Sequence, residues 1–232
     1  MDVSKYQAFA KAQLGDFKNT ELLITAFTHR SYLNEHRKTA TEHNERLEFL
    51  GDAVLELIVT EYLYANYPEP EGVLTNWRSA LVRTESISEA ASRLGFETLL
   101  RLSRGEKRGS ERARQQILAN CYEAVVGAVY LEKGYKGAKG FIEKSLLPMF
   151  DEILKSGSWL DPKSRLQELV QNRAGFTPVY KVLKEEGPDH DKQFEVGVFV
   201  DDEFKGQGAG PSKQAAQVAA ASQALGHYLK ED

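Results

Sequence analysis

The chain has 232 residues, of which 41% are apolar and 10% aromatic; this composition supports a packed core and excludes a wholly disordered chain. At roughly 100–200 residues per domain, the length allows one large domain or two modest ones. The formal net charge of −4 argues against a protein that coats nucleic acid over its whole surface. The net charge does not show, however, where the basic side chains lie.

Three features concern the cellular compartment. The sequence has no stretch near the roughly 18 consecutive apolar residues of a membrane span, and the longest clean run, residues 124–131, contains Gly127. The first residues, MDVSKYQAFAKAQ, lack the charged-then-apolar layout of a secretion signal. The single cysteine, Cys121, excludes an internal disulfide framework and a multi-cysteine zinc site. We therefore expect a soluble, cytoplasmic protein.

The first 155 residues show helical spacing of apolar side chains almost throughout. The segments expected to be helices are 21–28, 44–64, 74–94, 112–132 and 136–154. Proline and glycine separate these segments, and alternating strand patterns are absent from the sequence here. The pattern predicts an all-α domain over residues 1–155, followed by a small, polar linker over residues 156–160.

The pattern changes after the linker. Residues 164–171 have helical spacing, and residues 179–184, 193–200 and 203–206 are typical of strands, the second of them with valines at period two. A proline at position 211 then opens an alanine-rich helix that extends to residue 229. The order α-β-β-β-α predicts a small α+β domain over residues 161–232.

Acidic side chains form a stripe on the expected helix NERLEFLGDAVLELIV. At 100° per residue, Glu45, Glu48, Asp52 and Glu56 fall within an arc of roughly 80°. One interpretation is a solvated polar face. A solvated face usually mixes charges of both signs, because like charges one turn apart destabilise a helix. The other interpretation is a site that holds a cation or raises the pKa of its carboxyl groups.

A second helix strengthens the metal hypothesis. In QQILANCYEAVVGAVYLE, Asn120 and Glu123 lie three residues apart among apolar neighbours. A buried glutamate is rare unless it is paired or bound to a metal. If this helix crosses the first, Glu123 joins the acidic stripe, and such oxygen ligands suit Mg²⁺ or Mn²⁺. We expect structural roles for His29 and for Cys121, the residue that follows Asn120.

The run ERLEFLGD, residues 45–52, closely resembles the signature of ribonuclease III, the double-stranded-RNA endonuclease. The resemblance extends to FTHRSYLNE before it, to PEPEG and RSALVR after it, and to ILANCYEAVVGAVYL as the second acidic helix. Residues 161–229 resemble the double-stranded-RNA-binding domain that ends bacterial members. The resemblance therefore implies an all-α endonuclease domain followed by a small α+β double-stranded-RNA-binding domain.

For activity, the resemblance implies Mg²⁺-dependent cleavage of double-stranded RNA, with Mn²⁺ as a substitute, in rRNA and mRNA processing and decay. Family members act as homodimers in which each subunit cuts one strand, leaving 5′-phosphate and 3′-hydroxyl ends with two-nucleotide 3′ overhangs. Phe49, the phenylalanine of the signature, is then expected to insert into a pocket of the partner subunit. The alternative for Phe49 is packing in the core of its own subunit.

The resemblance also implies roles for the acidic residues. Glu48, Asp52 and Glu123 would hold the principal Mg²⁺, and Glu45 and Glu71 would act indirectly or nearby. Asp52, Glu123 and Glu45 are the expected catalytic residues.

One metal-ligand position departs from the family. Asn120 occupies the place of an aspartate; its amide oxygen can ligate a hard cation but carries no charge and accepts no proton. Three outcomes follow: an active variant, an enzyme that needs more metal, or a double-stranded-RNA-binding protein that does not cleave. We favour activity, because the other acids remain.

In the tail, the residues expected to contact RNA are Ser164, Gln167, Glu168, Gln171, His190, Ser212 and Lys213. The first four lie on one polar helix face, which suits 2′-hydroxyl groups in the RNA minor groove or, alternatively, only solvent. From residue 161 onward, nine basic side chains face twelve acidic ones, a net charge of −3. We therefore predict weak, salt-dependent binding that needs basic residues of the first domain. The candidates are Arg101, Arg104, Lys107, Arg108, Arg112 and Arg114.

Overall fold

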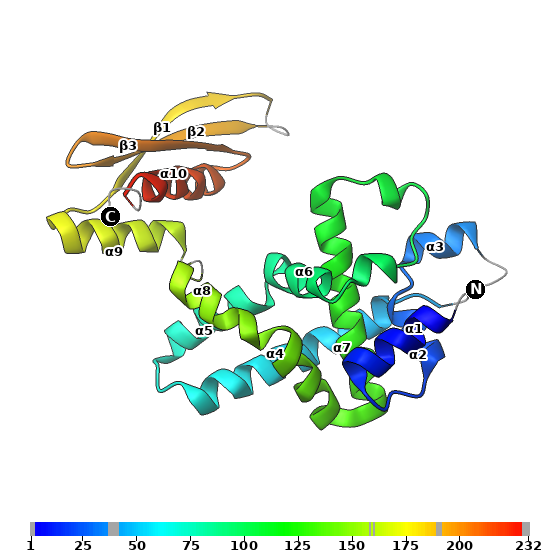
Figure 1. The fold of residues 1–232 in the computed structure, drawn as a ribbon. Coiled ribbons are helices and arrows are strands. Elements are labelled where there is room, and N and C mark those ends of the chain that lie inside the picture. Colours follow the sequence, from blue (N-terminus) through cyan, green and yellow to red (C-terminus); the bar gives the residue numbers. More distant parts are fainter. Residues whose placement is uncertain (1–2, 37–41, 158, 160, 189–191, 229–232) are drawn as a thin grey trace. The chain divides into compact units, whose positions relative to one another are not determined.

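The computed structural model describes residues 3–36, 42–157, 159, 161–188 and 192–228. The chain divides into two compact units, Met1–Trp159 and Leu160–Asp232, and each is considered by itself (Figure 1). The predicted linker, residues 156–160, includes Ser156, the last residue of a helix, and Trp159, whose ring packs at 5.8 Å from that of Trp77. Ser158 and Leu160 lie outside the described residues.

Unit 1 is all-α, as predicted. Its elements are α1 (Ser4–Phe9), η1 (Ala10–Leu14), α2 (Thr20–Ala26), α3 (Arg30–Glu35), α4 (Glu45–Asn66), α5 (Glu71–Val82), α6 (Thr84–Arg93), η2 (Phe96–Thr98), η3 (Glu106–Arg108), α7 (Glu111–Ser145), η4 (Leu147–Met149) and α8 (Phe150–Ser156). The short helices α1 and α3 were not predicted, since each has too few residues to show a clear period.

Helices α4 and α7 cross at the centre of unit 1 (Figure 1). Two glycines allow their backbones to approach closely. A Cβ atom on Gly51 would lie 1.7 Å from the carbonyl oxygen of Glu123, and one on Gly127 would lie 2.3 Å from that of Leu47. Because no other residue lacks a Cβ, glycine is required at both positions. The crossing brings the two acidic segments of the sequence together.

Two expected helices are in fact divided. The segment 74–94 breaks at Arg83, whose backbone is extended (φ −68°, ψ 155°), so that α5 and α6 are separate. The buried hydroxyl of Ser86 donates to the carbonyl of Ala80 across this break at 2.6 Å. The segment 136–154 is also not one helix: Pro148 lies in η4, and its missing N–H prevents α7 from continuing into α8.

Unit 2 has the predicted order α9 (Pro162–Ala174), β1 (Val179–Glu186), β2 (Gln193–Val200), β3 (Glu203–Gly210) and α10 (Lys213–Tyr228). The strands form an antiparallel sheet in the order β1-β2-β3, with Val182 opposite Val196 and Val198 opposite Gly206. Both helices cover one face of this sheet (Figure 1).

The valines of β2 point to the helices, and Val198 and Val200 belong to a core completed by alanines and leucines of α9 and α10. β1 and β3 extend beyond the predicted strands. Helix α10 begins at Lys213 rather than Pro211, because residues 208–210 pair in β3, and its predicted end, Leu229, lies outside the described residues. In the part of the chain described, no helix has the length and apolar character to cross a membrane.

Candidate active site

The acidic stripe of α4 separates into paired and unpaired members. Glu45 lies 3.6 Å from the Arg30 guanidinium, and Glu56 lies 3.1 Å from that of Arg78 on α5. Glu48 and Asp52, between them, have no ion pair with a basic side chain among the described residues. The middle of the stripe is therefore the part with uncompensated negative charge.

Helix α7 adds Glu123 to this unpaired part. Burial, together with the charges of Asp52 and Glu48, raises the pKa of Glu123 to about 8. Burial also raises the pKa of Glu48, together with the charge of Glu45. Since the charges of Asp52 and Glu48 act on Glu123 and that of Asp52 acts on Glu48, these three carboxyl groups lie near one another where α4 crosses α7.

Asn120 uses its amide within the site. Its Oδ1 atom accepts a hydrogen bond of 2.7 Å from Nε2 of Gln116, one turn earlier on α7. Its side chain also hydrogen-bonds Glu48, which counteracts part of the increase in the pKa of that carboxyl. The amide oxygen that would have to bind a cation therefore already accepts one hydrogen bond, from Gln116. The signal for Gln116 was present in the sequence as a polar residue four positions before Asn120.

The acidic groups do not form a ready cage. In the described residues, no group of three His, Cys, Asp or Glu side chains has the spacing to hold a metal ion. Glu71, at the start of α5, accepts a hydrogen bond of 3.1 Å from Thr75 and is not among the charges that raise the pKa of Glu48 or Glu123. We predicted that Glu71 lies close to the other acidic residues, but these contacts do not show it near Glu48 or Glu123.

The donor set nevertheless fits a hard divalent cation. Glu48, Asp52 and Glu123 offer only oxygen atoms, which are the ligands that Mg²⁺ and Mn²⁺ prefer. Their mutual repulsion in a partly buried site is unfavourable unless protons or a cation compensate it. The pKa of Glu123, raised to about 8, reflects this repulsion, because the carboxyl group keeps its proton up to a higher pH. A bound cation would compensate the negative charges in place of that proton.

His29 and Cys121 have the structural roles that the sequence predicted. His29 caps α3: its Nδ1 accepts a hydrogen bond from the backbone N–H of Ser31, and burial lowers its pKa. Cys121 is fully buried, and its thiol donates to the carbonyl of Ala26 at 3.5 Å. Burial keeps the pKa of this thiol well above its usual value, so it is not a nucleophile.

Phe49 does not pack in the core of its own unit. Its side chain is 83% exposed and borders a groove of about 810 Å³ that also includes Leu50 of α4, Leu22 of α2 and Leu131 of α7. An exposed phenylalanine beside an apolar groove is typical of a surface that another protein covers. The residues that line this groove were not predicted, because they come from segments distant in the sequence.

In unit 2, the predicted RNA-binding residues remain accessible. Ser164, Gln167, Glu168 and Gln171 are all exposed on α9. Ser212 caps α10 by accepting from the N–H of Ala215 at 3.1 Å. The Lys213 ammonium lies 3.9 Å from Glu185, and His190 lies outside the described residues.

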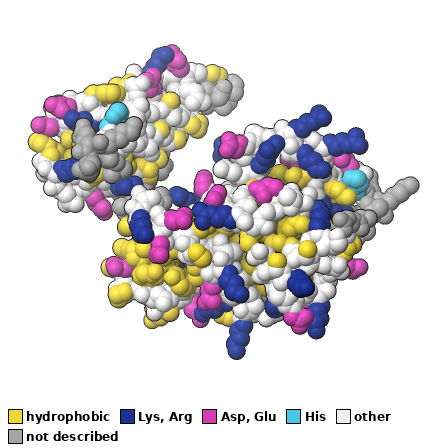
Figure 2. Space-filling model, in the orientation of Figure 1, with side chains coloured by type: hydrophobic (Ala, Val, Ile, Leu, Met, Phe, Trp, Pro, Cys, Tyr) yellow, Lys and Arg dark blue, Asp and Glu magenta, His cyan; other side chains and the backbone are white. Residues whose placement is uncertain are grey.

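The basic candidates of unit 1 differ in their availability. Arg101 is engaged within the fold: it donates to the Thr28 hydroxyl at 3.0 Å and lies over the Tyr32 ring. The other five are exposed: Arg104, Lys107, Arg108, Arg112 and Arg114. They lie around η3 and the start of α7, where Figure 2 shows dark-blue side chains gathered.

Comparisons with known proteins found a matching family model for each of the two units. Residues 19–150 match a family model described as Ribonuclease-III-like, and residues 162–228 match the double-stranded RNA binding motif. A protein named Ribonuclease 3 from Streptococcus gordonii is 45% identical over 215 residues, covering 90% of each chain. One from Geobacillus kaustophilus is 46% identical over 210 residues, covering 90% of this chain and 85% of the relative.

Solved structures give the same result for unit 1. The nuclease domain of ribonuclease III from Campylobacter jejuni, described for structural flexibility in a region involved in dimer formation, is 36% identical with a TM-score of 0.53. The match covers 60% of this chain and 96% of that one.

Proposed function

Because the chain belongs to the ribonuclease III family, we propose that this endoribonuclease cleaves double-stranded RNA in a Mg²⁺-dependent reaction, with Mn²⁺ as a substitute. The products are 5′-phosphate and 3′-hydroxyl ends with two-nucleotide 3′ overhangs, and the cellular role is rRNA and mRNA processing and decay in the cytoplasm. The double-stranded-RNA-binding domain in unit 2 supports RNA duplexes as the substrate.

The observation that carries the proposal is the unpaired acidic centre where α4 crosses α7. Glu48, Asp52 and Glu123 would hold the Mg²⁺, with Glu45 and Glu71 acting nearby. When bound, the cation supplies charge stabilisation for the non-bridging phosphate oxygens and makes a water molecule more acidic. Because the pKa of Glu123 is about 8 without a cation, binding of the cation near neutral pH should release a proton from this carboxyl group.

Substrate binding is divided between the two units. The exposed face of α9 offers hydroxyl and amide groups to the 2′-hydroxyls of the minor groove. Ser212 and Lys213 at the start of α10 would bind a phosphate, and His190 would contact the neighbouring minor groove. The exposed basic residues around η3 and α7 would bind further phosphates, compensating for the acidic tail.

We further propose that two copies associate through the groove beside Phe49. The 83% exposed ring would enter the groove of the partner subunit, and the groove of this copy would receive the partner's ring, as two-fold symmetry requires. The comparison with a nuclease domain that has a dimer-forming region supports this assembly. Each subunit would then cut one RNA strand.

A second candidate is a double-stranded-RNA-binding protein that does not cleave. The observation that favours it is the Asn120 amide, which carries no charge where the family has an aspartate and whose oxygen accepts a hydrogen bond from Gln116. Under this alternative the cation would bind too weakly for catalysis.

Incubation with a labelled RNA duplex, with and without Mg²⁺, separates the two candidates. We expect cleavage only with Mg²⁺, a loss of at least about a hundredfold in Glu123→Gln, and little change in Glu56→Gln, because Glu56 is already paired with Arg78. Duplex binding without cleavage at any Mg²⁺ concentration would establish the non-cleaving candidate.

A further inference from the structure

A second, basic site lies outside the acidic centre. A pocket of about 330 Å³ lies between η1 and the last part of α7. Four of its lining side chains are lysines: Lys11, Lys133, Lys136 and Lys144. Its lining, all of it within the described residues, includes no Asp or Glu. The pocket therefore concentrates positive charge in a chain whose net charge is negative.

These lysines differ from others on the same unit. Lys139 pairs with Glu61 at 2.9 Å, and Lys18 lies 3.6 Å from Asp16. By contrast, none of the four pocket lysines has a carboxylate within ion-pair distance in the described residues. Several positive charges that lie close together without a carboxylate favour the binding of an anion from solution.

The acids nearest in sequence are directed elsewhere. The carboxylate of Glu132 accepts the backbone N–H groups of Lys18 and Asn19 at the start of α2. The charge of Glu143 acts on Tyr135 and Lys139. Neither glutamate lines the pocket, so the lysines are not neutralised by their own neighbourhood.

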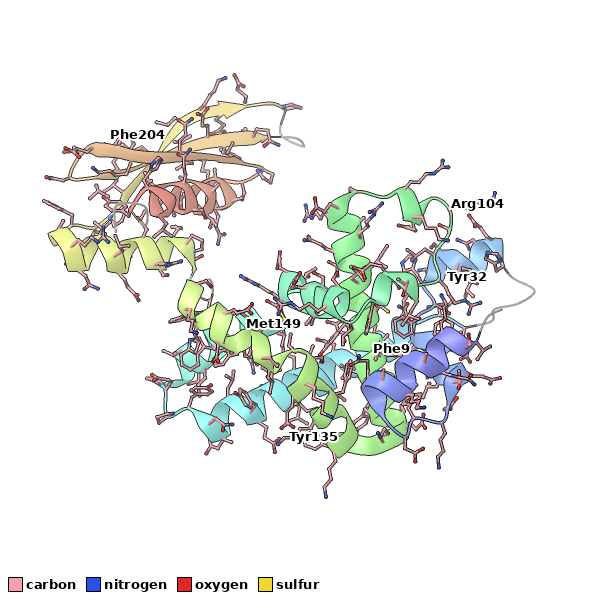
Figure 3. The ribbon with its side chains drawn as sticks, viewed as in Figure 1. Phe9, Tyr32, Arg104, Tyr135, Met149 and Phe204 are labelled. Atoms are coloured by element: carbon pink, nitrogen blue, oxygen red, sulfur yellow. The ribbon has the colours of Figure 1, made fainter. Side chains whose placement is uncertain are left out.

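The α7 residues that line the pocket lie on both sides of a break in that helix. Gly134 interrupts α7 with a positive φ of 64°, and Tyr135, labelled in Figure 3, follows this break. The Lys133 side chain lies against Gly137, where a Cβ atom would come within 2.3 Å of the Lys133 Cβ. Its ammonium donates to the carbonyl of Leu14 at 2.6 Å, which fixes it at the pocket and leaves two N–H groups for a ligand.

We propose that this pocket binds a di- or triphosphate group. A volume of about 330 Å³ is at the small end of ligand pockets and suits a compact, highly charged anion. Ammonium groups bind phosphate oxygens as point charges, and four of them match the several charges of a polyphosphate. Such a group occurs on a free nucleotide or at the 5′ end of an RNA strand.

Calorimetric titration of the metal-free full chain with inorganic tripolyphosphate tests the proposal, at about 0.15 M salt to suppress non-specific attraction. We expect saturable binding that weakens at least about tenfold, or roughly 1.4 kcal/mol, in Lys136→Gln/Lys144→Gln. The matched control Lys18→Gln/Lys155→Gln removes two exposed charges of the same unit outside the pocket and should change affinity less than about twofold. Absence of saturable binding, or equal weakening by both pairs, overturns the proposal.

Gly137→Ala supplies an independent test, because it retains every lysine. With folding verified by circular dichroism, we expect weaker tripolyphosphate binding, since the new methyl group displaces the Lys133 side chain; unchanged affinity contradicts the site. Competition with ATP and with a 5′-triphosphorylated RNA strand, compared with the same strand ending in a 5′-hydroxyl, then identifies the source of the phosphate group. Failure of both competitors to displace tripolyphosphate counts against the site. None of these measurements depends on RNA cleavage.

Discussion

Asn120 shows how much a single amide changes the acidic centre. An aspartate at this position would add a negative charge beside Glu48, Asp52 and Glu123, whereas the amide donates to Glu48 and accepts from Gln116. The amide thus reduces repulsion in the absence of a cation and also reduces attraction for one. Its effect on activity should depend on the metal concentration.

We predict that Asn120→Asp increases the cleavage rate at limiting Mg²⁺ by about tenfold, with the two proteins converging at saturating Mg²⁺, because an added carboxylate strengthens cation binding. Initial rates measured across a Mg²⁺ series provide the test. Asn66→Asp, which adds the same charge at the far end of α4, is the control. Equal rates at low Mg²⁺ would show that the amide is harmless.

Glu123 makes folding stability depend on pH. Its pKa of about 8 in the folded protein lies above the usual value near 4.5, so the ionised carboxylate is disfavoured by folding. This group therefore costs no stability below about pH 4.5, and the cost grows as the pH rises to about 8.

In EDTA, Glu123→Gln should stabilise the protein at pH 8.5, on the order of 1–2 kcal/mol after allowance for solvent screening, and have little effect at pH 4.5. Thermal unfolding at both values measures this difference, with exposed Glu69→Gln as the control. A gain of the same size at both pH values would contradict the assignment.

At the scale of elements, the close crossing of α4 and α7 positions the candidate active site. Gly51 and Gly127 let the backbones meet, so that side chains from both helices reach one centre. The extended backbone at Arg83 ends α5 and separates it from α6. Helix α5 contributes Arg78, which pairs with Glu56 of the acidic stripe.

Gly51→Ala should destabilise unit 1 by about 3 kcal/mol or more, since its Cβ atom would lie 1.7 Å from a backbone oxygen and the helices would have to separate. Urea unfolding gives the free energy. Gly72→Ala, where a Cβ meets no atom within 4 Å, is the matched control and should be neutral or stabilising. Retained stability in Gly51→Ala would show that the crossing is looser than described.

At the scale of the whole molecule, the proposed dimer would form through the apolar groove beside the exposed Phe49. Phe49→Asp should yield monomers and lose most RNA cleavage, because a charge cannot be buried unpaired in the partner's groove. Light scattering after size-exclusion chromatography measures the mass. Tyr64→Asp is a suitable control, since Tyr64 is similarly exposed, at 82%, on α4 but does not line the groove. A dimeric Phe49→Asp protein would exclude this interface.

RNA affinity should also be a property of the two units together. Unit 2 has its own core but a net charge of −3, so we expect the isolated unit to bind an RNA duplex weakly and to release it as salt increases. A salt titration of unit 2 and of the full chain tests this. Nanomolar affinity of unit 2 alone at physiological salt would refute it.

The local pattern of residues predicted most of the elements and the acidic residues of the candidate site. Helical spacing in unit 1, period-two valines in β2 and the acidic positions 45, 48, 52 and 123 depend only on neighbours along the chain, because hydrophobic period follows backbone geometry. For that reason the all-α domain and the α-β-β-β-α order were predictable, whereas the proximity of Glu123 to Glu48 and Asp52 was expected only if the second helix crossed the first and from the resemblance to ribonuclease III.

Tertiary structure decided which of these groups have partners. Arg78 pairs with Glu56 and not with Glu48, the Asn120 oxygen accepts from Gln116, and Phe49 remains exposed. The break at Arg83 is likewise fixed by packing of α5 and α6 rather than by any proline or glycine at that position. These outcomes depend on contacts between side chains distant in sequence or on competition for one hydrogen bond, and a periodic pattern contains no information about either.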